Sequence, residues 1–255
     1  MDNLVTVIMP AYNSAAFIET AIRSVMAQTY DAWRLLVLDD GSTDDTVERV
    51  QRLAEEDSRI TLIINEQNYG VARTRNRGLD MCQEGYVAFL DSDDCWHPEK
   101  LESQIRLAGE SGADILYSSY AIVDDSGRPC CRPYTVPQEA DFNLLLRENV
   151  IGCSATMLSP RAARKYRFTL GYYHEDYCLW LRMLRDGCRA AGCPQVLTMW
   201  RLSKGSRSFN KYNSACQRWR IYRDYLQLPL GKCIVPFIGY AVSGFKKYAR
   251  NEQND

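Results

Sequence analysis

The sharpest cluster of polar side chains in this 255-residue chain is Asp91-Ser92-Asp93-Asp94, directly after the apolar segment Tyr86 to Leu90. Carboxylates two residues apart at the end of a buried strand can share one divalent cation, and hard oxygen ligands suit magnesium or manganese. Such a cation neutralises a diphosphate and stabilises the charge that grows as the diphosphate leaves. An Asx-rich turn that caps the next helix is the alternative for the same residues.

A second acidic cluster, Asp39-Asp40-Gly41-Ser42-Thr43-Asp44, follows the apolar segment Leu35 to Leu38. Ser42 with Asp45 resembles a capping box that starts a helix. Two adjacent acids are more than a helix cap requires. A carboxylate at this strand end can instead accept a hydrogen bond from a uracil imide or a ribose hydroxyl. Pro10-Ala11-Tyr12-Asn13 can line the same base, with Tyr12 as a flat stacking surface; a tyrosine packed against the protein is the alternative.

A basic segment, Asn68 to Gly78, follows the third apolar run of the chain. Gly70 and Gly78 permit close approach of the backbone. Arg73 and Arg77 lie four residues apart and therefore share one face of a helix. One of the two arginines is expected to face a phosphate or the carboxylate at Asp40, and a solvated basic helix face is the alternative.

A third acidic cluster, His174-Glu175-Asp176, opens an apolar segment that continues through Trp180. Two acids at the start of a helix interact favourably with its dipole, which is a sufficient structural explanation. The functional alternative makes Asp176 a general base that removes a proton from an attacking hydroxyl. His174, one of two histidines, is then a neighbouring or acceptor contact.

Apolar runs that alternate with helical patterns position these clusters. They predict βαβ units and a mostly parallel sheet with helices on both faces. Ligands of such sheets bind beyond the carboxyl ends of the strands, so Pro10 to Asn13, Asp39 to Ser42 and Asp91 to Asp94 should converge on one crevice. The expected strands are Leu4–Met9, Leu35–Leu38, Ile60–Ile64, Tyr86–Leu90 and Ala113–Tyr117; helices are expected from Ser14, after Ser42, over Val71–Met81 and from Pro98.

The pattern loosens after Asp124, which suggests a different role for the second half of the chain. The expected elements there are helices over Phe142–Arg147, from Ser159-Pro160 and over about Glu175–Arg185, and strands over Ser154–Leu158 and Gln195–Arg201. We divide the chain into residues 1–120, residues 121–208 of the same domain and a C-terminal tail (209–255).

Composition narrows the functional classes. A hydrophobic content of 46% with 25% charged residues supports a folded core. The formal net charge of -1 argues against a general nucleic-acid binder. No apolar run is long enough to predict a membrane-spanning helix. The ten cysteines include no Cys-x-x-Cys pair, and without a secretory signal they are expected to be reduced thiols of a cytoplasmic protein.

Together these segments resemble the family-2 inverting glycosyltransferases of the nucleotide-diphospho-sugar (GT-A) fold. The similarity runs from residue 4 to about 208 in the family's order and spacing. It is carried by Val5 to Asn13, Leu38 to Asp44, Asn68-x-Gly70-x-Ala72-Arg73-x-x-Asn76-x-Gly78, Phe89 to Asp94 with Trp96 and Pro98, and Glu175-Asp176-x-x-Leu179-Trp180. Each motif alone is weak, whereas the ordered set is specific.

The resemblance implies an α/β fold with a Rossmann-like, mostly parallel central sheet flanked by helices, a C-terminal acceptor region and a basic amphipathic helical tail. It makes residues 1–120 the nucleotide-sugar-binding half and residues 121–208 the acceptor-binding and catalytic-base half of the same domain, followed by the basic amphipathic tail (209–255). It implies that Asp40 binds uracil, Asp91 the ribose or donor sugar, Asp93 a manganese or magnesium ion, and that Asp176 is the catalytic base. The further nucleotide contacts expected are Pro10, Ala11, Tyr12, Arg73 and Ser92. Donor-phosphate or acceptor contacts are expected from Arg201, Ser206, Glu175, Trp180 and His174.

The family's single in-line displacement implies inversion, with a β-linked product formed from an α-linked UDP-sugar. Processive synthases of the family carry a Gln-x-x-Arg-Trp motif and membrane helices. Here Gln217-Arg218-Trp219 lacks that spacing. We therefore expect an enzyme that adds one sugar.

The C-terminal tail is basic and rich in aromatic residues. Between Arg201 and Arg250 the only acid is Asp224. This composition suits an interface with anionic lipid, whereas closure of the core or a homodimer contact is the alternative. The membrane interpretation favours a lipid-linked acceptor, such as a polyprenyl-diphosphate intermediate of bacterial O-antigen or capsule synthesis, and an enzyme at the inner face of the cytoplasmic membrane.

Two other functions compete. A sugar nucleotidyltransferase shares the broad fold but needs a Gly-rich, basic loop after the first strand, where this chain has Pro10-Ala11-Tyr12-Asn13. A catalytically inactive nucleotide-sugar-binding scaffold is the other alternative, and the presence of Asp93 and Asp176 argues against it.

Overall fold

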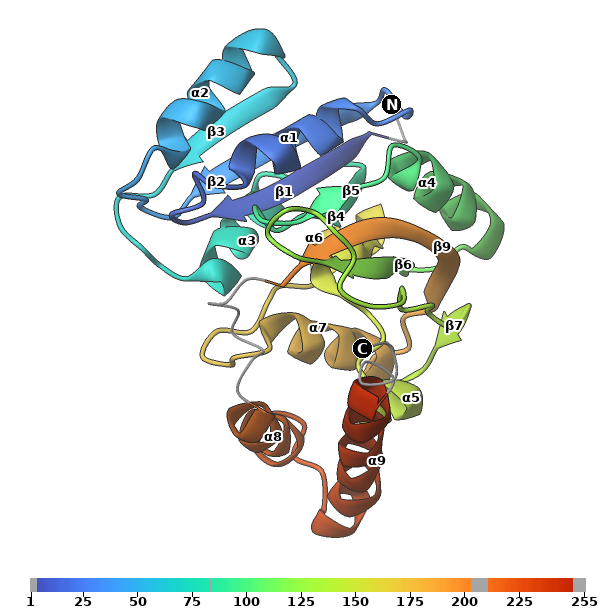
Figure 1. Ribbon diagram of the computed structural model, residues 1–255. Helices are drawn as coiled ribbons and strands as arrows, with labels where there is room; N and C mark the ends of the chain where they lie inside the picture. The colour runs from blue at the N-terminus through green and yellow to red at the C-terminus, as the bar shows by residue number, and fades with distance from the viewer. Residues whose placement is uncertain (1–3, 83, 203–210, 250–255) are drawn as a thin grey trace.

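The computed structural model describes residues 4–82, 84–202 and 211–249. Within these ranges, strands form one sheet in the order β3-β2-β1-β4-β8-β6-β9-β5, with β7 paired to β9. The strands are β1 (Val5–Ala11), β2 (Trp33–Asp39), β3 (Ile60–Ile64), β4 (Tyr86–Phe89), β5 (Cys95–Trp96), β6 (Ile115–Val123), β7 (Glu139–Ala140), β8 (Thr156–Leu158) and β9 (Ala190–Arg201). The expected α/β fold with a central sheet flanked by helices is confirmed (Figure 1).

Helices cover both faces of the sheet (Figure 1). The α-helices are α1 (Ile18–Met26), α2 (Thr46–Glu56), α3 (Val71–Asp80), α4 (Lys100–Ser111), α5 (Phe142–Arg147), α6 (Pro160–Lys165), α7 (Glu175–Arg185), α8 (Lys211–Arg220) and α9 (Leu230–Ala249). Alternate residues of β1 face opposite sides: Val7 and Met9 pack in the core that contains α1 and α2 residues, and Ile8 packs in the core that contains α3 and α7 residues.

The sheet consists of two parallel groups joined by an antiparallel strand. Strands β3, β2, β1 and β4 are mutually parallel, as the apolar runs predict. Strand β8 then pairs antiparallel with both β4 and β6, and β6 runs parallel to β9. Because β8 is antiparallel to both of its neighbours, β6 and β9 run the same way as β1 and β4. The carboxyl ends of all these parallel strands therefore lie at one edge.

Several element boundaries differ from the sequence expectation. Neither Ser14 nor Ser42 caps a helix: the Ser14 hydroxyl contacts Ser92 Oγ, and Ser42 Oγ accepts from the Asn13 amide. These serines connect loops instead. Helix α4 begins at Lys100, two residues beyond Pro98. Ser159 does cap α6, since its side chain accepts from the Ala162 amide.

Helices α8 and α9 lie on the far side of α7 from the sheet (Figure 1), joined by a π-helix over Ile221–Tyr225. Ile221, Tyr222, Leu226 and Cys233 are buried in the core that also contains α7 residues. Part of the tail thus closes the core, which was one of the alternatives. A helix long and apolar enough to cross a membrane does not occur in the described ranges. The division of the chain at residues 120 and 208 stays a prediction.

Candidate functional site

A cavity of about 630 Å³ lies at the carboxyl ends of β1 and β4, beside the amino ends of α3 and α7. The three strand-end segments that were expected to converge all contribute to it. Its lining residues are Pro10 to Ser14, Phe17, Asp40, Asn68, Gly70, Val71, Arg75, Asp91 to Asp93, Cys153, Tyr173 to Asp176, Trp200 and Arg201. Acids far apart in the chain, Asp40, Asp93 and Asp176, therefore face one space.

Asp40 is buried and held by three donors. Its Oδ1 accepts from Asn65 Nδ2 at 2.7 Å and from the Tyr69 amide at 3.0 Å, and its Oδ2 accepts from the Gly70 amide at 2.8 Å. A carboxylate offers about four lone-pair sites. One acceptor site on Oδ2 therefore remains for a donor in the cavity.

Two glycines shape the loops around Asp40. Gly41 has φ of +78°, and a Cβ there would lie 3.0 Å from the Gln67 carbonyl carbon. Gly70 has φ of +87° and precedes α3. Both conformations favour glycine over any residue with a side chain. The two loops can therefore meet and present the Gly70 amide to Asp40.

The two arginines predicted for this region behave differently. Arg77 donates to Asn65 Oδ1 and so orients the amide whose nitrogen donates to Asp40. Arg73, the predicted nucleotide contact, is exposed, does not line the cavity, and lies over the Tyr69 ring at 5.1 Å. The structure gives no support to a phosphate contact from Arg73.

Arg75, which lies two residues after Arg73, is the arginine that enters the site. It is 2% exposed and donates to Asp91 Oδ1 at 2.5 Å and to Glu175 Oε1 at 2.6 Å. The adjacent carboxylates raise the pKa of its guanidinium despite its burial. Sequence reasoning missed this residue. The sequence did contain one sign that Arg75 faces inward: Leu79, an apolar residue, lies four positions later on the same face of the helix.

The Asp91-Ser92-Asp93-Asp94 loop is fixed from several sides. The Asp91 amide donates to Ser154 Oγ, and Ser92 Oγ contacts Ser14 Oγ at 2.7 Å. Asp94 is buried and accepts from the Arg201 amide at 2.8 Å; burial, with the charges of Asp93 and Asp91, raises its pKa well above the usual carboxyl range. Asp91 and Asp93 remain half-buried at the cavity wall.

Arg201 anchors this loop through its side chain. Its Nε donates to the Asp93 carbonyl at 2.9 Å, and one terminal nitrogen donates to the carbonyls of Asp124 and Asp125 at 2.7 and 2.9 Å. The guanidinium also lies over the Phe17 ring at 4.5 Å. Arg201 was predicted to meet the donor phosphates; the structure gives it a positioning role at the cavity wall.

Asp176 lies half-buried at the start of α7, and its Oδ1 accepts from the Tyr177 amide at 2.7 Å. Burial and the neighbouring Glu175 charge raise the pKa of Asp176 from 3.8 to about 6, while the Arg75 charge opposes this rise. A carboxylate whose pKa lies near neutrality is a better general base than an ordinary one. The catalytic role of Asp176 stays a prediction.

The remaining predicted contacts divide into three groups. His174 and Glu175 line the cavity, although the Glu175 carboxylate is engaged by Arg75. Trp180 is fully buried against Phe89 and Phe168, so its prediction as a donor or acceptor contact is wrong. The apolar residues next to it in α7, Cys178, Leu179 and Leu181, are also buried, so Trp180 belongs to the core. Ser206 lies outside the described residues.

The donor set fits a divalent cation that also binds a diphosphate. No group of three or more His, Cys, Asp or Glu side chains suited to a metal occurs in the described part of the chain. Magnesium, however, is usually held by one or two carboxylates together with substrate phosphates. Asp93 supplies such a carboxylate, half-buried at the cavity wall.

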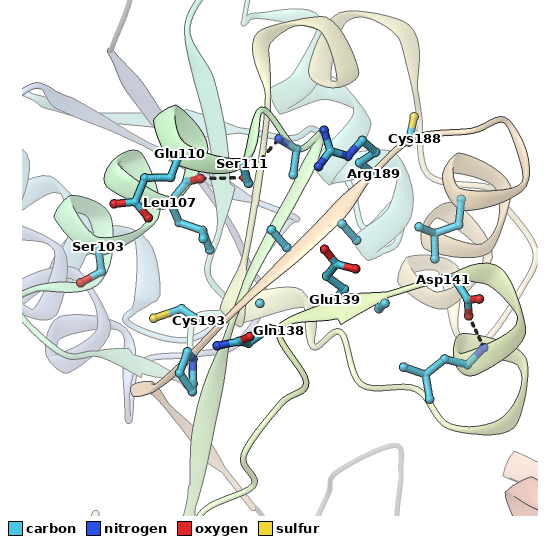
Figure 2. Close-up of a pocket in the computed structure, with 18 of the residues that line it drawn as sticks. Ser103, Leu107, Glu110, Ser111, Gln138, Glu139, Asp141, Cys188, Arg189 and Cys193 are labelled. Carbon is cyan, nitrogen blue, oxygen red and sulfur yellow. Dashed lines mark hydrogen bonds between the residues drawn. The ribbon is translucent and has the colours of Figure 1, made fainter.

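A larger cavity, of about 890 Å³, lies at the amino end of β9, at the opposite end of that strand from Arg201 (Figure 2). Its wall is formed by α4, β7, α5 and the first residues of β9, and includes Glu110, Glu139 and Arg189. Asp141, also in this wall, caps α5 through the Leu144 amide. The residues of the predicted motifs do not line it, so the smaller cavity is the candidate active site.

Comparison with known proteins agrees with this geometry. The family model described as "Glycosyl transferase family 2" matches residues 6–168. The chain is 37% identical over 254 residues to the Escherichia coli protein "UDP-Glc:alpha-D-GlcNAc-diphosphoundecaprenol beta-1,3-glucosyltransferase WfgD", covering 99% of this chain and 98% of that one. It is 33% identical to the "Putative teichuronic acid biosynthesis glycosyltransferase TuaG" of Bacillus subtilis, covering 96% and 97%. Both relatives carry the names of glycosyltransferases, which gives no support to the nucleotidyltransferase alternative.

Solved structures share the fold. S. aureus TarS 1-349 in complex with UDP-GlcNAc superposes with a TM-score of 0.71 at 20% identity, covering 86% of this chain and 64% of that chain. The mannosyltransferase PcManGT from Pyrobaculum calidifontis, in complex with GDP-Man and Mn2+, gives a TM-score of 0.68 at 18% identity, covering 90% and 66%. The family match over most of the chain, together with full-length relatives above 30% identity, shows that this protein belongs to glycosyl transferase family 2 and is a glycosyltransferase.

Proposed function

We propose that this enzyme transfers one sugar, with inversion, from a UDP-sugar to a hydroxyl of a polyprenyl-diphosphate-linked saccharide, in the synthesis of a bacterial surface polysaccharide such as O-antigen or capsule. The observation that carries the proposal is the meeting of Asp40, Asp93 and Asp176 around one cavity of about 630 Å³. Each of these acids suits a different part of the reaction.

We assign the nucleotide of the donor to the part of the cavity at the carboxyl ends of β1 and β2. Asp40 retains an acceptor site on Oδ2, which suits the imide N–H of uracil. Tyr12, half exposed at the rim, offers a flat face for the base. Pro10 and Ala11 form the backbone wall of the same corner, and Ser92 forms part of its floor.

The diphosphate is assigned to the Asp91–Asp94 loop, with Asp93 as the protein ligand of a manganese or magnesium ion. That ion, when bound, neutralises the diphosphate as it leaves. Arg201 holds the Asp93 carbonyl, and Ser14 holds Ser92, so the loop keeps its shape without rearrangement. A preorganised charge site of this kind lowers the barrier because little reorganisation is needed during reaction.

Asp176 is assigned as the general base. Its raised pKa lets it accept the proton of the acceptor hydroxyl as that oxygen attacks the anomeric carbon. Two of the other carboxylates that line the cavity, Asp91 and Glu175, accept hydrogen bonds from Arg75, which lowers their nucleophilicity. This arrangement favours a single displacement with inversion over a covalent glycosyl intermediate.

The acceptor class is inferred from relatives. The name of WfgD specifies a UDP-glucose donor and an undecaprenol-diphosphate-linked GlcNAc acceptor, and TuaG is named for teichuronic acid biosynthesis. A lipid-linked acceptor favours a cytoplasmic enzyme that is peripheral at the inner face of the cytoplasmic membrane. The basic C-terminal segment is the proposed attachment.

The test is a transfer assay with a panel of UDP-sugars and a short-chain prenyl-diphosphate-linked GlcNAc. We expect a single added sugar in a β linkage, read by mass spectrometry and by the anomeric coupling in NMR spectra. Chelation should abolish transfer, and added manganese should restore it. An α-linked product would contradict inversion, and repeated addition would contradict the non-processive assignment. Full activity in chelator would exclude the metal.

A further inference from the structure

Helix α9 carries a row of large aliphatic side chains on its solvent side. Leu230, Ile234, Val235 and Ile238 are 58%, 50%, 63% and 57% exposed. Their spacing of four, five and eight residues from Leu230 places them on one side of the helix. We call this surface the α9 apolar face. Half-exposed aliphatic residues occur singly on most proteins, but four together on one helix form a surface that indicates a binding function.

The opposite side of α9 is already used to pack the helix on the protein. Cys233 is fully buried, and Phe237 lies edge-to-face on Trp219 with ring centroids 5.2 Å apart. Gly239 faces Arg147 of α5, where an added Cβ would lie 3.4 Å from the arginine side chain. The helix is thus fixed through one side, and the α9 apolar face stays exposed in the part of the chain that the structure describes.

The charged side chain beside this face is a cation. Lys232 is exposed beside the aliphatic residues, and α9 contains no acidic residue. A second copy of the same face would bring like charges together. A surface that is apolar along its centre and basic beside it instead complements an anionic bilayer, where aliphatic side chains enter the acyl boundary and lysines remain among the headgroups.

We propose that the α9 apolar face lies in the interfacial region of an anionic membrane, with the helix along the membrane surface. Figure 1 shows that the amino-terminal end of α9, where these residues lie, points away from the sheet and forms an extremity of the molecule. The inference deepens the proposed function, because it names the surface that brings the enzyme to a lipid-linked acceptor.

The test is flotation of the intact protein with vesicles of phosphatidylcholine alone or mixed with phosphatidylglycerol. We expect binding only to the mixed vesicles, and weaker binding as salt rises. The double variant Ile234→Gln, Ile238→Gln should bind about tenfold less or weaker still, because each buried isoleucine contributes strongly to partition. Lys232→Gln should lose about fivefold.

The matched control is Ile64→Gln, since Ile64 is the same residue type with 51% exposure on β3. It should float like the parent, and thermal unfolding checks that all variants are folded. Binding unchanged in the Ile234/Ile238 variant would overturn the inference. So would a dimer in sedimentation velocity that this variant dissociates, because the face would then bind a second copy.

Failure of this inference and failure of the proposed function are separable. Hydrolysis of a UDP-sugar in solution, without vesicles, depends on the cavity and is expected to be the same in the α9 variants and the parent. Loss of vesicle binding with donor hydrolysis intact therefore reports on the α9 apolar face alone.

Discussion

The Arg75 guanidinium donates to Glu175 Oε1 at 2.6 Å, which joins α3 to α7 across 100 residues of sequence. A second nitrogen of the same guanidinium donates to Asp91 at the end of β4. One buried cation thus ties together the three elements that surround the cavity. Arg75 therefore fixes the position of Asp91, on the proposed donor side of the cavity, relative to the start of α7, where the proposed catalytic base lies.

Replacement of Arg75 by methionine should destabilise the fold strongly. Glu175 is 6% exposed at its side chain, so the variant leaves a buried carboxylate without its cation. Breaking a buried pair in this way typically costs about 3–5 kcal/mol. Urea unfolding of Arg75→Met measures the loss. Arg73→Met, an exposed arginine on the same helix, is the control and should remain near the parent value; equal losses in the two variants would contradict the role of Arg75.

Asp176→Asn should reduce turnover by about 10²–10⁴-fold, the usual contribution of a general base, while UDP affinity stays unchanged. The asparagine keeps an oxygen that can accept from the Tyr177 amide, so the start of α7 should be preserved. Transfer rates at saturating donor, with UDP titration by calorimetry, separate the two effects. A variant that loses UDP binding in proportion to turnover would exclude a role limited to base catalysis.

The pH profile should show the raised pKa of Asp176. The base must be ionised, so kcat/KM is expected to fall as pH drops through about 6. Activity therefore rises with pH, whereas the stability of the fold should fall. The folded state favours the protonated Asp176 carboxyl, so its ionisation costs stability as pH rises from 3.8 to about 6. Asp176→Asn avoids this cost. Its Tm relative to the parent should therefore rise across that interval, and a constant difference would show that the pKa is not raised.

The sequence was sufficient to predict the strand-end clusters because each follows a continuous apolar run that is long enough to form a buried strand. Pro10–Asn13, Asp40 and Asp91–Asp93 therefore converge as expected. It was not sufficient to choose between Arg73 and Arg75. Both are basic residues on one short helix, and the choice depends on which face meets Glu175, a contact made by a distant segment.

Tertiary contacts also determine the hydrogen-bond partners of Ser14 and Ser42 and the burial of Trp180. Ser14 and Ser42 have the local pattern of helix caps, yet each hydroxyl bonds to another loop around the cavity. Trp180 follows the catalytic-base motif, but it is fully buried against Phe89 and Phe168. Local pattern predicts what a residue can bond, whereas the surrounding elements determine what it does bond.

Asp93→Ala should abolish the part of UDP affinity that depends on manganese. The variant removes the carboxylate proposed to ligand the ion, whereas the Asp40 end of the cavity is unchanged. Calorimetric titration with UDP, with and without manganese, measures this. Asp45→Ala removes an exposed acid whose side chain caps no helix, and it should bind like the parent. Manganese-dependent affinity that survives in Asp93→Ala would assign the ion to other ligands.

Arg201→Lys should weaken UDP binding in manganese by about tenfold, although the charge is kept. The reason is geometric. Arg201 spans the carbonyls of Asp93, Asp124 and Asp125 with two nitrogens of a rigid fork, and a lysine ammonium is a single point that cannot reach both loops. The Asp91–Asp94 loop should then become mobile, and amide exchange over residues 91–94 should accelerate.

The control for Arg201 is Arg128→Lys on the neighbouring turn. Arg128 is 81% exposed and pairs with Asp124 at 3.5 Å, so its replacement should change neither binding nor exchange. If Arg201→Lys bound UDP as tightly as the parent while its amide exchange increased, the loop would tolerate mobility and its preorganisation would not contribute to binding. If neither quantity changed, the hydrogen bonds from Arg201 to the two loops would be dispensable, and the shape of the metal-binding loop would have to come from Ser14, Ser92 and Ser154 instead.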